Sequence, residues 1–403
     1  MDTLKSFKDY YPLDFLKRDK LLELLKNTSN EFGYIPYDGP IIESQSLYEL
    51  KSGEGIMEEV YSFRDKGGRD VVLRPEMTPT LSRMIAKKSK SLKKPLRWYS
   101  IPTIFRYERS QKGRSREFIQ YNADIIGENS SLAEIEIIDL CMSILEKLGF
   151  LRDDFDILVN DRTFICEYIS SLTSNVSEIL YIIDHKDKID KKEFLQNLEK
   201  ILKNKEKVNK IIKFLENTDY KKSDNLKDLF TKSLNFNLKL SYNPYLVRGF
   251  DYYTGIVFEI WDKKRKIQRS IFGGGRYSDL ISNMGGDNIS ACGSATSDTI
   301  LFALMEEYNK KINIDITYDY FISVFPNIEY SIYYKIANTL RKRGYSVLLN
   351  INPSWSITKQ LEFALSQNVE KFIITGEKEL KNNELIVKDL KNHKEKIIKL
   401  NDL

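Results

Sequence analysis

A stretch of 80 residues without glycine or proline, Phe164 to Asn243, most strongly constrains how this chain can fold. The stretch is rich in lysine, leucine, isoleucine and asparagine at helical spacing. Glycine and proline are the residues that most often interrupt a helix, so their absence favours helical structure throughout. The segments on both sides contain strand patterns and turn residues instead. We therefore expect a compact helical insert that interrupts a domain built around β-strands.

The segment before the insert alternates between helical and strand patterns. Helices are predicted at 14–32, 79–90 and 132–148. Extended chain is predicted at 34–42, a hairpin around DKGGRD at 59–74, and two strands at 96–109 and 116–127. In the first helix one broad face contains Phe15, Leu21, Leu22 and Leu25. Strands rich in glycine and aromatic residues return at 238–307. Together the two segments predict a mostly antiparallel sheet flanked by helices.

The C-terminal region alternates strand and helix patterns, from YFISVF through IYYKIANTLRKRG to KFIITG and LIVKDL, after the charged linker EEYNKKINIDITYD. This alternation predicts a separate small α/β domain. The fold class is therefore α+β. We expect a first part of the main domain at 1–162, a helical insertion domain at 163–235, the second part at 236–310 and the last domain at 316–403.

Composition excludes several classes of function. No run approaches the roughly 18 apolar residues that cross a bilayer, and the N-terminus has no signal-peptide pattern, so we expect a cytoplasmic protein without a membrane partner. Cys141, Cys166 and Cys292 form no metal-binding spacing, and the only histidines are His185 and His393. A zinc site or a Ser/His/Asp triad is therefore not expected, and no cluster of protein side chains predicts a metal.

Charge gives a weaker indication. The chain has a formal net charge of +5, and residues 186–232 alone contain 14 lysines against 9 acidic residues. A lysine-rich helical face is usually solvated, which is the interpretation we favour from charge alone. Contact with RNA is the alternative.

The most unusual segment is FRYERSQKGRSREFIQYNADIIG, from Phe105 to Gly127. Alternation along two strands places six side chains on one face: Arg106, Glu108, Phe118, Gln120, Asn122 and Asp124. An arginine for phosphate, an aromatic ring for a base, an amide and a carboxylate suit a pocket for ATP and an amino acid. An exposed charged hairpin is an equally good interpretation of the pattern.

Three other segments have functional and structural interpretations. Arg248, in LVRGFDYYTGIVFE, lies among apolar neighbours and needs a partner, for which we favour a salt bridge over a phosphate. The glycines of SIFGGGRYSDL permit a turn or a close backbone approach, and they match no phosphate-loop motif. Glu76, in LRPEMT, either holds a substrate ammonium group or caps the helix that follows.

In order and spacing, these segments resemble the class II aminoacyl-tRNA synthetases and, within them, the histidyl-tRNA synthetase family. GYIPYDGPIIE at 33–43 is similar to the first class motif, which implies a homodimer interface around Pro40. FRYERSQKGRSREF is similar to the second motif, and LVRGFDYYTG and GGGRY to the two histidyl segments. The resemblance covers nearly the whole chain, and implies an anticodon-binding domain at its end.

The resemblance also implies roles for individual residues. Arg106 and Arg248 would contact the α-phosphate of ATP as the catalytic residues, with Glu108 and Arg114 on the phosphates and metal and Phe118 on adenine. Glu76, Thr78 and Gln120 would hold the amino and carboxylate groups of histidine, and Asp124, Tyr253 and Tyr277 its imidazole. Gln111 would meet the acceptor end of the tRNA. The expected partners are histidine, ATP with Mg²⁺, and histidine tRNA.

The implied reaction forms histidyl-adenylate from histidine and ATP and then transfers histidine to the tRNA. Three positions depart from the family pattern. Ile300, or Thr299 with a gap, stands where the third motif has an arginine for the γ-phosphate, and Ser297 replaces its glycine. Asp124 stands where glutamate is commoner, and the loop contains RSQ in place of RPQ. The alternatives are a paralogue that does not charge tRNA, such as a regulatory subunit of ATP phosphoribosyltransferase, and an RNA-binding protein.

Overall fold

The computed structural model describes residues 2–49, 57, 59–108, 115–186, 189–248 and 252–402. Contacts divide the chain into two compact units, residues 1–312 and 313–403. Each unit has its own sheet, and the two are described separately. No helix in the described part of the chain is long and apolar enough to span a membrane.

A mixed sheet forms the centre of the first unit, with strand order β1-β5-β7-β12-β11-β10-β8-β9 and β6 also paired with β7. The pairs from β5 to β8 are antiparallel, whereas the edge pairs β1–β5 and β8–β9 are parallel. This confirms the expected mostly antiparallel sheet. The strands are β1 (Ile35–Pro36), β5 (Leu96–Ser100), β6 (Thr103–Phe105), β7 (Glu117–Ile126), β8 (Phe155–Asp161), β9 (Leu240–Tyr242), β10 (Ile256–Asp262), β11 (Phe272–Arg276) and β12 (Ala291–Ser297).

The glycine run Gly273–Gly275 lies inside β11, in the middle of this sheet, and does not form a turn. A Cβ atom on Gly274 would come within 3.0 Å of both the Gly293 carbonyl and the Phe258 ring. Real Cβ atoms do not approach so closely, so the glycine permits tight packing on the neighbouring strands. Of the two interpretations of the run, the close backbone approach is the one confirmed.

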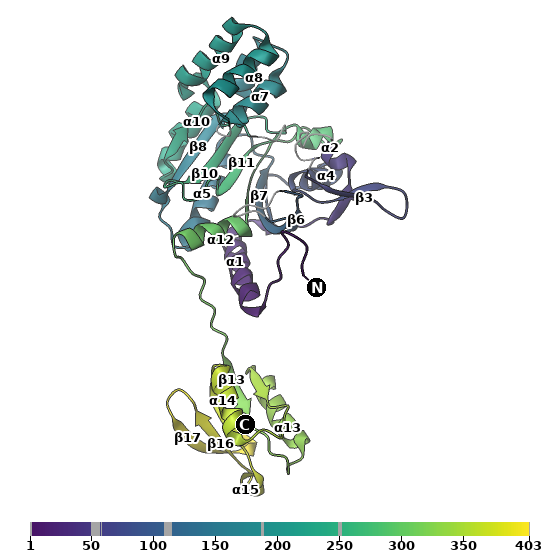
Figure 1. Cartoon of the computed structure of the whole chain (residues 1–403), viewed down its shortest axis with the longest axis vertical. Helices are drawn as coiled ribbons and strands as arrows, with labels where there is room; N and C mark the ends of the chain where they lie inside the picture. The colour runs from purple at the N-terminus through teal and green to yellow at the C-terminus, as the bar shows by residue number, and fades with distance from the viewer. Residues whose placement is uncertain are drawn as a thin grey trace. The chain divides into compact units, whose positions relative to one another are not determined.

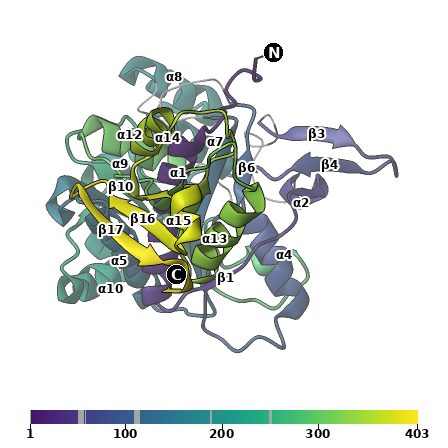
Figure 2. The same cartoon turned by 90° about the horizontal axis from the view of Figure 1, so that it is seen from below.

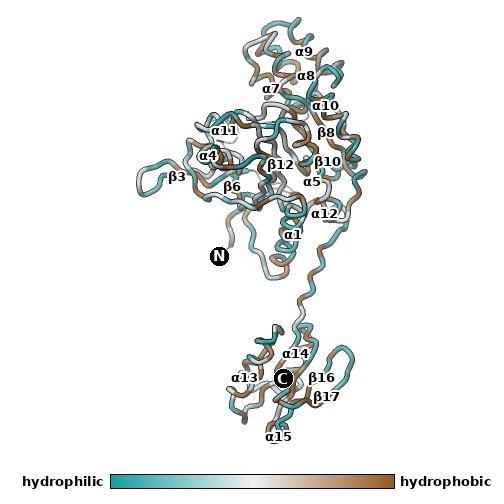
Figure 3. Tube along the Cα trace, turned by 180° about the vertical axis from the view of Figure 1, so that it is seen from behind, coloured by the Kyte–Doolittle hydropathy of each residue, from teal (hydrophilic) through white to brown (hydrophobic). Residues whose placement is uncertain are grey.

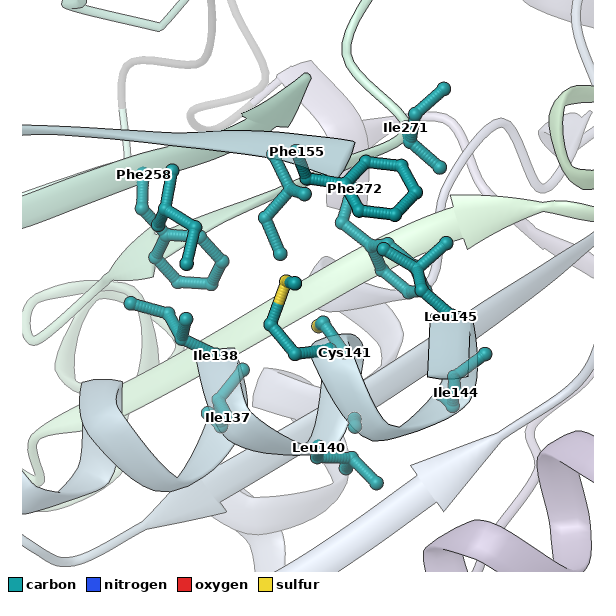
Figure 4. Packing of buried hydrophobic residues seen from close by; sticks show 14 of the residues in the cluster. Ile137, Ile138, Leu140, Cys141, Ile144, Leu145, Phe155, Phe258, Ile271 and Phe272 are labelled. Carbon is teal, nitrogen blue, oxygen red and sulfur yellow. The ribbon is translucent and has the colours of Figure 1, made fainter. Parts of the chain in front are cut away.

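Helices α1 (Pro12–Glu31), α5 (Leu132–Lys147), α10 (Asp224–Ser233) and α12 (Asp298–Glu307) pack around the main core of this unit. The inward face of α5 includes Ile138, Cys141 and Leu145, and Figure 4 shows these side chains directed toward Phe258 and Phe272. Figure 3 shows hydrophobic stretches along β8 and β10 and hydrophilic residues at the tip of the hairpin beyond β3. The expected apolar face of α1 is confirmed for Leu21 and Leu25, but Phe15 is about half exposed.

The helical insert has a core of its own. Helices α6 (Arg162–Ser170), α7 (Val176–Asp184), α8 (Lys191–Leu202) and α9 (Lys205–Asn217) bury apolar side chains between residues 165 and 215 against one another. Helix α10 instead packs on α5 and β8 and contributes Leu226 and Leu229 to the main core. The change from one core to the other therefore falls before α10, earlier than the expected insert boundary at 235. Figure 1 shows α7, α8 and α9 grouped together, with α10 beside β8.

A three-stranded sheet with order β2-β4-β3 forms the remaining part of the first unit. It confirms the hairpin expected at 59–74, with Arg64 opposite Asp70 and Gly68 in the turn at φ +77°. Helix α4 begins at the end of this sheet and packs on α11. The elements are β2 (Ile42–Ser44), α2 (Ser46–Glu49), β3 (Tyr61–Arg64), β4 (Asp70–Leu73), α4 (Thr78–Lys88) and α11 (Leu280–Asn283).

The second unit is a small α/β domain, as expected. Its sheet has the order β14-β13-β15-β16-β17, with β13 parallel to both neighbours and the last two pairs antiparallel. The final strand, β17, was not predicted, and Figure 2 shows it beside β16. The elements are β13 (Tyr318–Ile322), α13 (Tyr330–Lys342), β14 (Val347–Leu349), α14 (Ile357–Ser366), β15 (Val369–Ile374), α15 (Glu377–Lys381), β16 (Glu384–Asp389) and β17 (Lys394–Lys399).

Candidate active site

One pocket of the first unit brings together segments that lie far apart in the sequence. It lies over β7, β12 and β11 and is closed by the start of α4, the chain after β6 and the chain before β10. The residues expected from the sequence that line it are Glu76, Thr78, Arg106, Glu108, Phe118, Gln120, Asp124, Arg248, Tyr253 and Tyr277. Gln111 and Arg114, also expected at the site, lie outside the described residues.

One face of β7, which has the predicted alternation of side chains, lines the floor of this pocket. Phe118, Gln120, Asn122 and Asp124 all face it and are between 4% and 9% exposed. Tyr107, which has the opposite parity to Arg106 and Glu108, is 54% exposed and does not line the pocket. The exposed-hairpin interpretation of these residues is therefore wrong, and the pocket interpretation of the pattern is correct in its geometry.

Arg106 is held at the pocket wall by the protein itself. Its Nε donates to the carbonyl oxygen of Pro75 at 2.7 Å, and its Nη1 lies 3.7 Å from Glu108 Oε1. The guanidinium carbon is 5.6 Å from the centre of the Phe118 ring. A cation fixed beside an aromatic face suits a ligand that combines an anionic group with a planar base.

Arg248 forms the salt bridge that the sequence favoured, and it also lines the pocket. Its Nη1 pairs with the Glu259 carboxylate on β10. Its Nε is buried and has no hydrogen-bond partner among the described residues. Burial acts to lower the pKa of Arg248, but the nearby Tyr253 and Glu259 more than offset it, so the pKa is raised and the group stays charged.

The geometry around Arg248 depends on two backbone features. Arg248 has φ +60°, a left-handed conformation that non-glycine residues adopt infrequently and that often marks functional sites. Gly273 lies against it, because a Cβ there would come within 3.0 Å of the guanidinium group. The first glycine of GGGRY thus leaves the space in which the arginine reaches the pocket.

Glu76 belongs to the pocket and is not a helix cap. The N-cap residue of α4 is Met77, and no side chain makes a capping hydrogen bond there. The Glu76 side chain is 3% exposed and accepts a hydrogen bond from the Tyr252 hydroxyl at 3.0 Å. The capping interpretation of Glu76 is therefore wrong, and a buried carboxylate faces the pocket beside Thr78, the first residue of α4.

Asp124 and Tyr277 form a hydrogen-bonded pair at one end of the pocket. The Tyr277 hydroxyl donates to Asp124 Oδ1 at 2.6 Å. Burial raises the pKa of Asp124 to about 7, and the Tyr277 hydrogen bond acts in the opposite direction. A Cβ on Gly293 would come within 3.0 Å of Oδ1, so this glycine on β12 makes room for the carboxylate.

Arg276 fixes Tyr277 from outside the pocket. Its Nε and Nη2 each donate to the buried carboxylate of Glu134 on α5 at 2.6 Å, a bidentate arrangement. The backbone amide of Thr254 also donates to the Arg276 carbonyl at 2.8 Å. The arginine of GGGRY is therefore a positioning residue that locks the end of β11 onto α5.

The start of α12 forms the opposite end of the pocket and contributes no cation. Ser297 caps the helix by accepting from the Ile300 amide at 3.3 Å, and its hydroxyl lies 2.8 Å from that of Thr299. Ile300 is 4% exposed and belongs to the main core. The cationic side chains among the described lining residues are Arg106, Arg248 and Arg269.

Among the lining residues that sequence reasoning missed, Tyr252 and Arg269 have the largest polar side chains. Tyr252 adjoins Tyr253 in the DYYTG segment, and the two rings lie 4.8 Å apart. Arg269 lies before β11 and outside the strand alternation, so no local pattern identified it. Within the described residues no group of three or more His, Cys, Asp or Glu side chains can hold a metal ion.

A family model described as histidyl-tRNA synthetase matches residues 6–298. The chain belongs to the histidyl-tRNA synthetase family. A second model, described as an anticodon binding domain, matches residues 322–403. Relatives of this family are 34% identical in Leptospira biflexa, over 96% of this chain and 93% of the relative, and 35% identical in Picrophilus torridus, over 100% and 98%. Both are named histidine–tRNA ligase.

Solved structures of the family share this fold. Apo histidyl-tRNA synthetase from S. aureus superposes with a TM-score of 0.75 at 22% identity, covering 100% of this chain and 98% of that one. A Bacillus halodurans protein described as an ATP phosphoribosyltransferase regulatory subunit/histidyl-tRNA synthetase has a TM-score of 0.73 at 18% identity, covering 92% and 97%. At these identities the likeness concerns the fold alone.

Proposed function

We propose that this chain is a histidine–tRNA ligase, which activates histidine with ATP and transfers it to the 3′ end of histidine tRNA. One observation carries the proposal beyond family membership. A single pocket holds a buried carboxylate–tyrosine pair, Asp124 and Tyr277, and also two arginines, Arg106 and Arg248, that line its wall. The first pair suits an imidazole and the arginines suit a phosphate.

The histidine subsite would use six residues of the pocket. Asp124 would accept a hydrogen bond from an imidazole N–H, with Tyr253 and Tyr277 completing the recognition of the ring. Glu76, Thr78 and Gln120 would hold the amino and carboxylate groups. Gln120 Oε1 supports this assignment, because it is buried and has no hydrogen-bond partner among the described residues. Such an acceptor suits a substrate ammonium group.

The nucleotide subsite would place adenine against Phe118 and the α-phosphate between Arg106 and Arg248, with Glu108 and Arg114 on the outer phosphates. A carboxylate oxygen of histidine attacks the α-phosphorus, and the bond to the β-phosphate oxygen breaks, which gives histidyl-adenylate and pyrophosphate. The two arginines stabilise the charge that grows on the phosphate oxygens. A terminal ribose hydroxyl of the tRNA then attacks the adenylate carbonyl and AMP leaves.

No protein histidine is needed as a general base in this scheme. His185 and His393 do not line the pocket, and much of the rate would come from positioning the two substrates. Mg²⁺ would arrive with the nucleotide, with Glu108 as the nearby carboxylate; when bound, it neutralises charge on the phosphates. A lone protein carboxylate is consistent with Mg²⁺ held mainly by phosphates and water.

The expected domains fit this activity. The helices α6 to α9 would form the insertion domain, the segments before and after them, up to residue 310, the catalytic domain, and residues 316–403 the anticodon-binding domain. Removal of residues 313–403 should weaken tRNA charging far more than histidine activation; equal losses would make the second unit structural. Gln111 would contact the acceptor end of the tRNA, and its substitution should slow transfer without slowing activation.

We also propose that the chain forms a homodimer and acts in the cytoplasm. The segment expected at the dimer interface, 33–43, exposes Ile35 and Ile41, and Ile42 follows at 50% exposure. Exposed aliphatic residues in one segment favour burial against a second copy. Light scattering on the purified chain should give twice the monomer mass of 47.2 kDa, and a monomer at micromolar concentration would contradict this part of the proposal.

A paralogue that does not charge tRNA is the second candidate, favoured by the apolar Ile300 at the start of α12. The GFDYYTG segment and the anticodon-binding match argue against it. ATP–pyrophosphate exchange with each of the twenty amino acids separates the two. Exchange with histidine alone is the expected result. No exchange, in a folded protein that still binds histidine or tRNA, would favour the paralogue.

A further inference from the structure

Arg269 is a cation of the pocket to which the proposed reaction assigns no role. It lies before β11 and lines the same pocket as Arg106 and Arg248. Those two arginines are assigned to the α-phosphate, and Arg114, the cation assigned to the outer phosphates, lies outside the described residues. A bound ATP would extend two more phosphates, which carry most of its negative charge, and the described part of α12 that lines the pocket offers only Ser297, Thr299 and Ile300.

The pairing of β11 with β12 brings the segment before β11 close to the end of β12, where α12 begins. Gly273 lies opposite Ala295 and Gly275 opposite Gly293. Continuing the same register by one residue brings Phe272, the first residue of β11, opposite Thr296 of β12. The Thr296 hydroxyl donates to the Ile271 carbonyl at 2.6 Å and holds the two chains together at that end. Arg269, two residues before Ile271, lines the pocket together with Ser297, Thr299 and Ile300, none of which is a cation.

Hydrogen bonds to Asp262 and to the end of α12 anchor the segment that precedes Arg269. The Asp262 carboxylate, at the end of β10, accepts from the backbone amides of Lys264 at 3.1 Å and Lys266 at 2.7 Å. Lys266 Nζ in turn donates to the carbonyl of Glu307, in the last turn of α12, at 3.0 Å. The buried Ile267 follows, two residues before Arg269. A side chain on so fixed a backbone is prepared to bind with little loss of entropy.

We propose that Arg269 binds the β- and γ-phosphates of ATP, in place of a cation on α12. The proposal rests on the nucleotide subsite proposed above and adds to it a residue for the leaving pyrophosphate. The planar guanidinium presents a fork of donors that matches two phosphate oxygens. Arg269 would thus be specific for the triphosphate, whereas Arg106 and Arg248 serve any nucleotide with an α-phosphate.

Nucleotide binding to the purified full chain, measured by calorimetry, tests this proposal. In Arg269→Gln we expect the affinities for ATP and for pyrophosphate to fall by about 10- to 100-fold, the range for a lost charge-assisted interaction. The affinity for AMP should stay within about twofold. Arg269→Lys should recover part of the loss, because it keeps the charge without the fork.

Lys263→Gln is the matched control, since it removes one positive charge from the same loop at an exposed position that does not line the pocket. It should leave all three affinities unchanged. Equal losses for ATP and AMP in Arg269→Gln, or no loss for either, would overturn the proposal. A chain that binds ATP but performs no histidine-dependent exchange would instead overturn the proposed function, while the comparison of ATP with AMP would still decide the role of Arg269.

Discussion

At the Asp124 end of the pocket the two carboxylates already accept hydrogen bonds from tyrosines, whereas at the arginine end the cations are held by the protein and Arg248 keeps an unused donor. Tyr277 donates to Asp124, and Tyr252 donates to Glu76. Arg248 pairs with Glu259, yet its Nε has no partner among the described residues. The carboxylates of the amino-acid end are therefore preformed with tyrosine donors beside the open Gln120 oxygen, and the phosphate end is preformed as a concentration of positive charge.

This difference has a physical reason. A neutral ring such as imidazole is recognised by a few directed hydrogen bonds, and the tyrosine donors stabilise the two buried carboxylates when the ligand is absent. A phosphate is recognised by charge, and an arginine can stay charged beside a carboxylate when no ligand is bound. Substitutions at the two ends should therefore affect different substrates and different kinetic constants.

The largest effect is expected at Arg248. In Arg248→Gln the rate of histidine-dependent ATP–pyrophosphate exchange should fall by about 100- to 1,000-fold, because a donor to the developing charge is lost. Glu259→Gln is the control for the ion pair. It should lose much less, and the double variant should match Arg248→Gln. Unchanged exchange in Arg248→Gln, with circular dichroism and tRNA binding preserved, would remove Arg248 from the mechanism.

Asp124 should control histidine and leave ATP unaffected. In Asp124→Asn the KM for histidine is expected to rise by about 10- to 100-fold, since the charged acceptor for the imidazole N–H is lost. The KM for ATP should change by less than about threefold. Tyr277→Phe, which keeps the carboxylate and removes its donor, should have a smaller effect. A comparable rise in the KM values for histidine and for ATP would mean that the two substrates do not bind at separate ends of the pocket.

Two glycines provide a matched pair for the same comparison. Gly293→Ala places a methyl group against the Asp124 carboxylate, and Gly273→Ala places one against the Arg248 guanidinium. We expect roughly tenfold weaker histidine binding in the first and roughly tenfold slower exchange at saturating histidine in the second, as for other overpacked sites. Calorimetry with histidine and exchange kinetics measure the two effects. The opposite assignment would reverse the proposed subsites.

The pH dependence of histidine binding should follow the Asp124 carboxyl. Its pKa is about 7, raised by burial, so the charged acceptor is present above pH 7 and is lost as the pH falls below it. Affinity for histidine should fall by about tenfold from pH 8 to pH 6, after correction for the imidazole of free histidine. Asp124→Asn should abolish this part of the slope. A slope that persists in that variant would come from another group.

The smallest expected effect is on the melting temperature of the ligand-free chain when Asp124 is replaced. A carboxyl whose folded pKa is raised above its unfolded value contributes stability at pH below about 4, and that contribution is lost as the pH rises through 7. Asp124→Asn should therefore raise the melting temperature of the ligand-free chain by a few degrees at pH 8 relative to pH 5. Differential scanning calorimetry at the two pH values measures the change. An equal shift at both would show that packing, and not ionisation, limits stability there.

Much of the fold follows from local pattern. The absence of glycine and proline from 164 to 243 predicted helices there, and DKGGRD predicted the β3–β4 hairpin. The strand period of two is a local property, so it identified Phe118, Gln120 and Asp124 as one face of β7. The short β17 escaped prediction because KEKIIK is strongly charged, and only pairing with β16 makes it a strand.

The sequence by itself determined which side chains share a face, and the tertiary structure decided which faces meet. Arg248 reaches the wall opposite β7 because Gly273 leaves space for it, and Glu76 meets Tyr252 across 176 positions of sequence. Helix α10 packs on α5, although its composition matches the insert. Arg269 precedes β11, and only the folded chain places it in the pocket together with Thr299. Such pairings depend on packing between distant segments, and local periodicity contains no information about them.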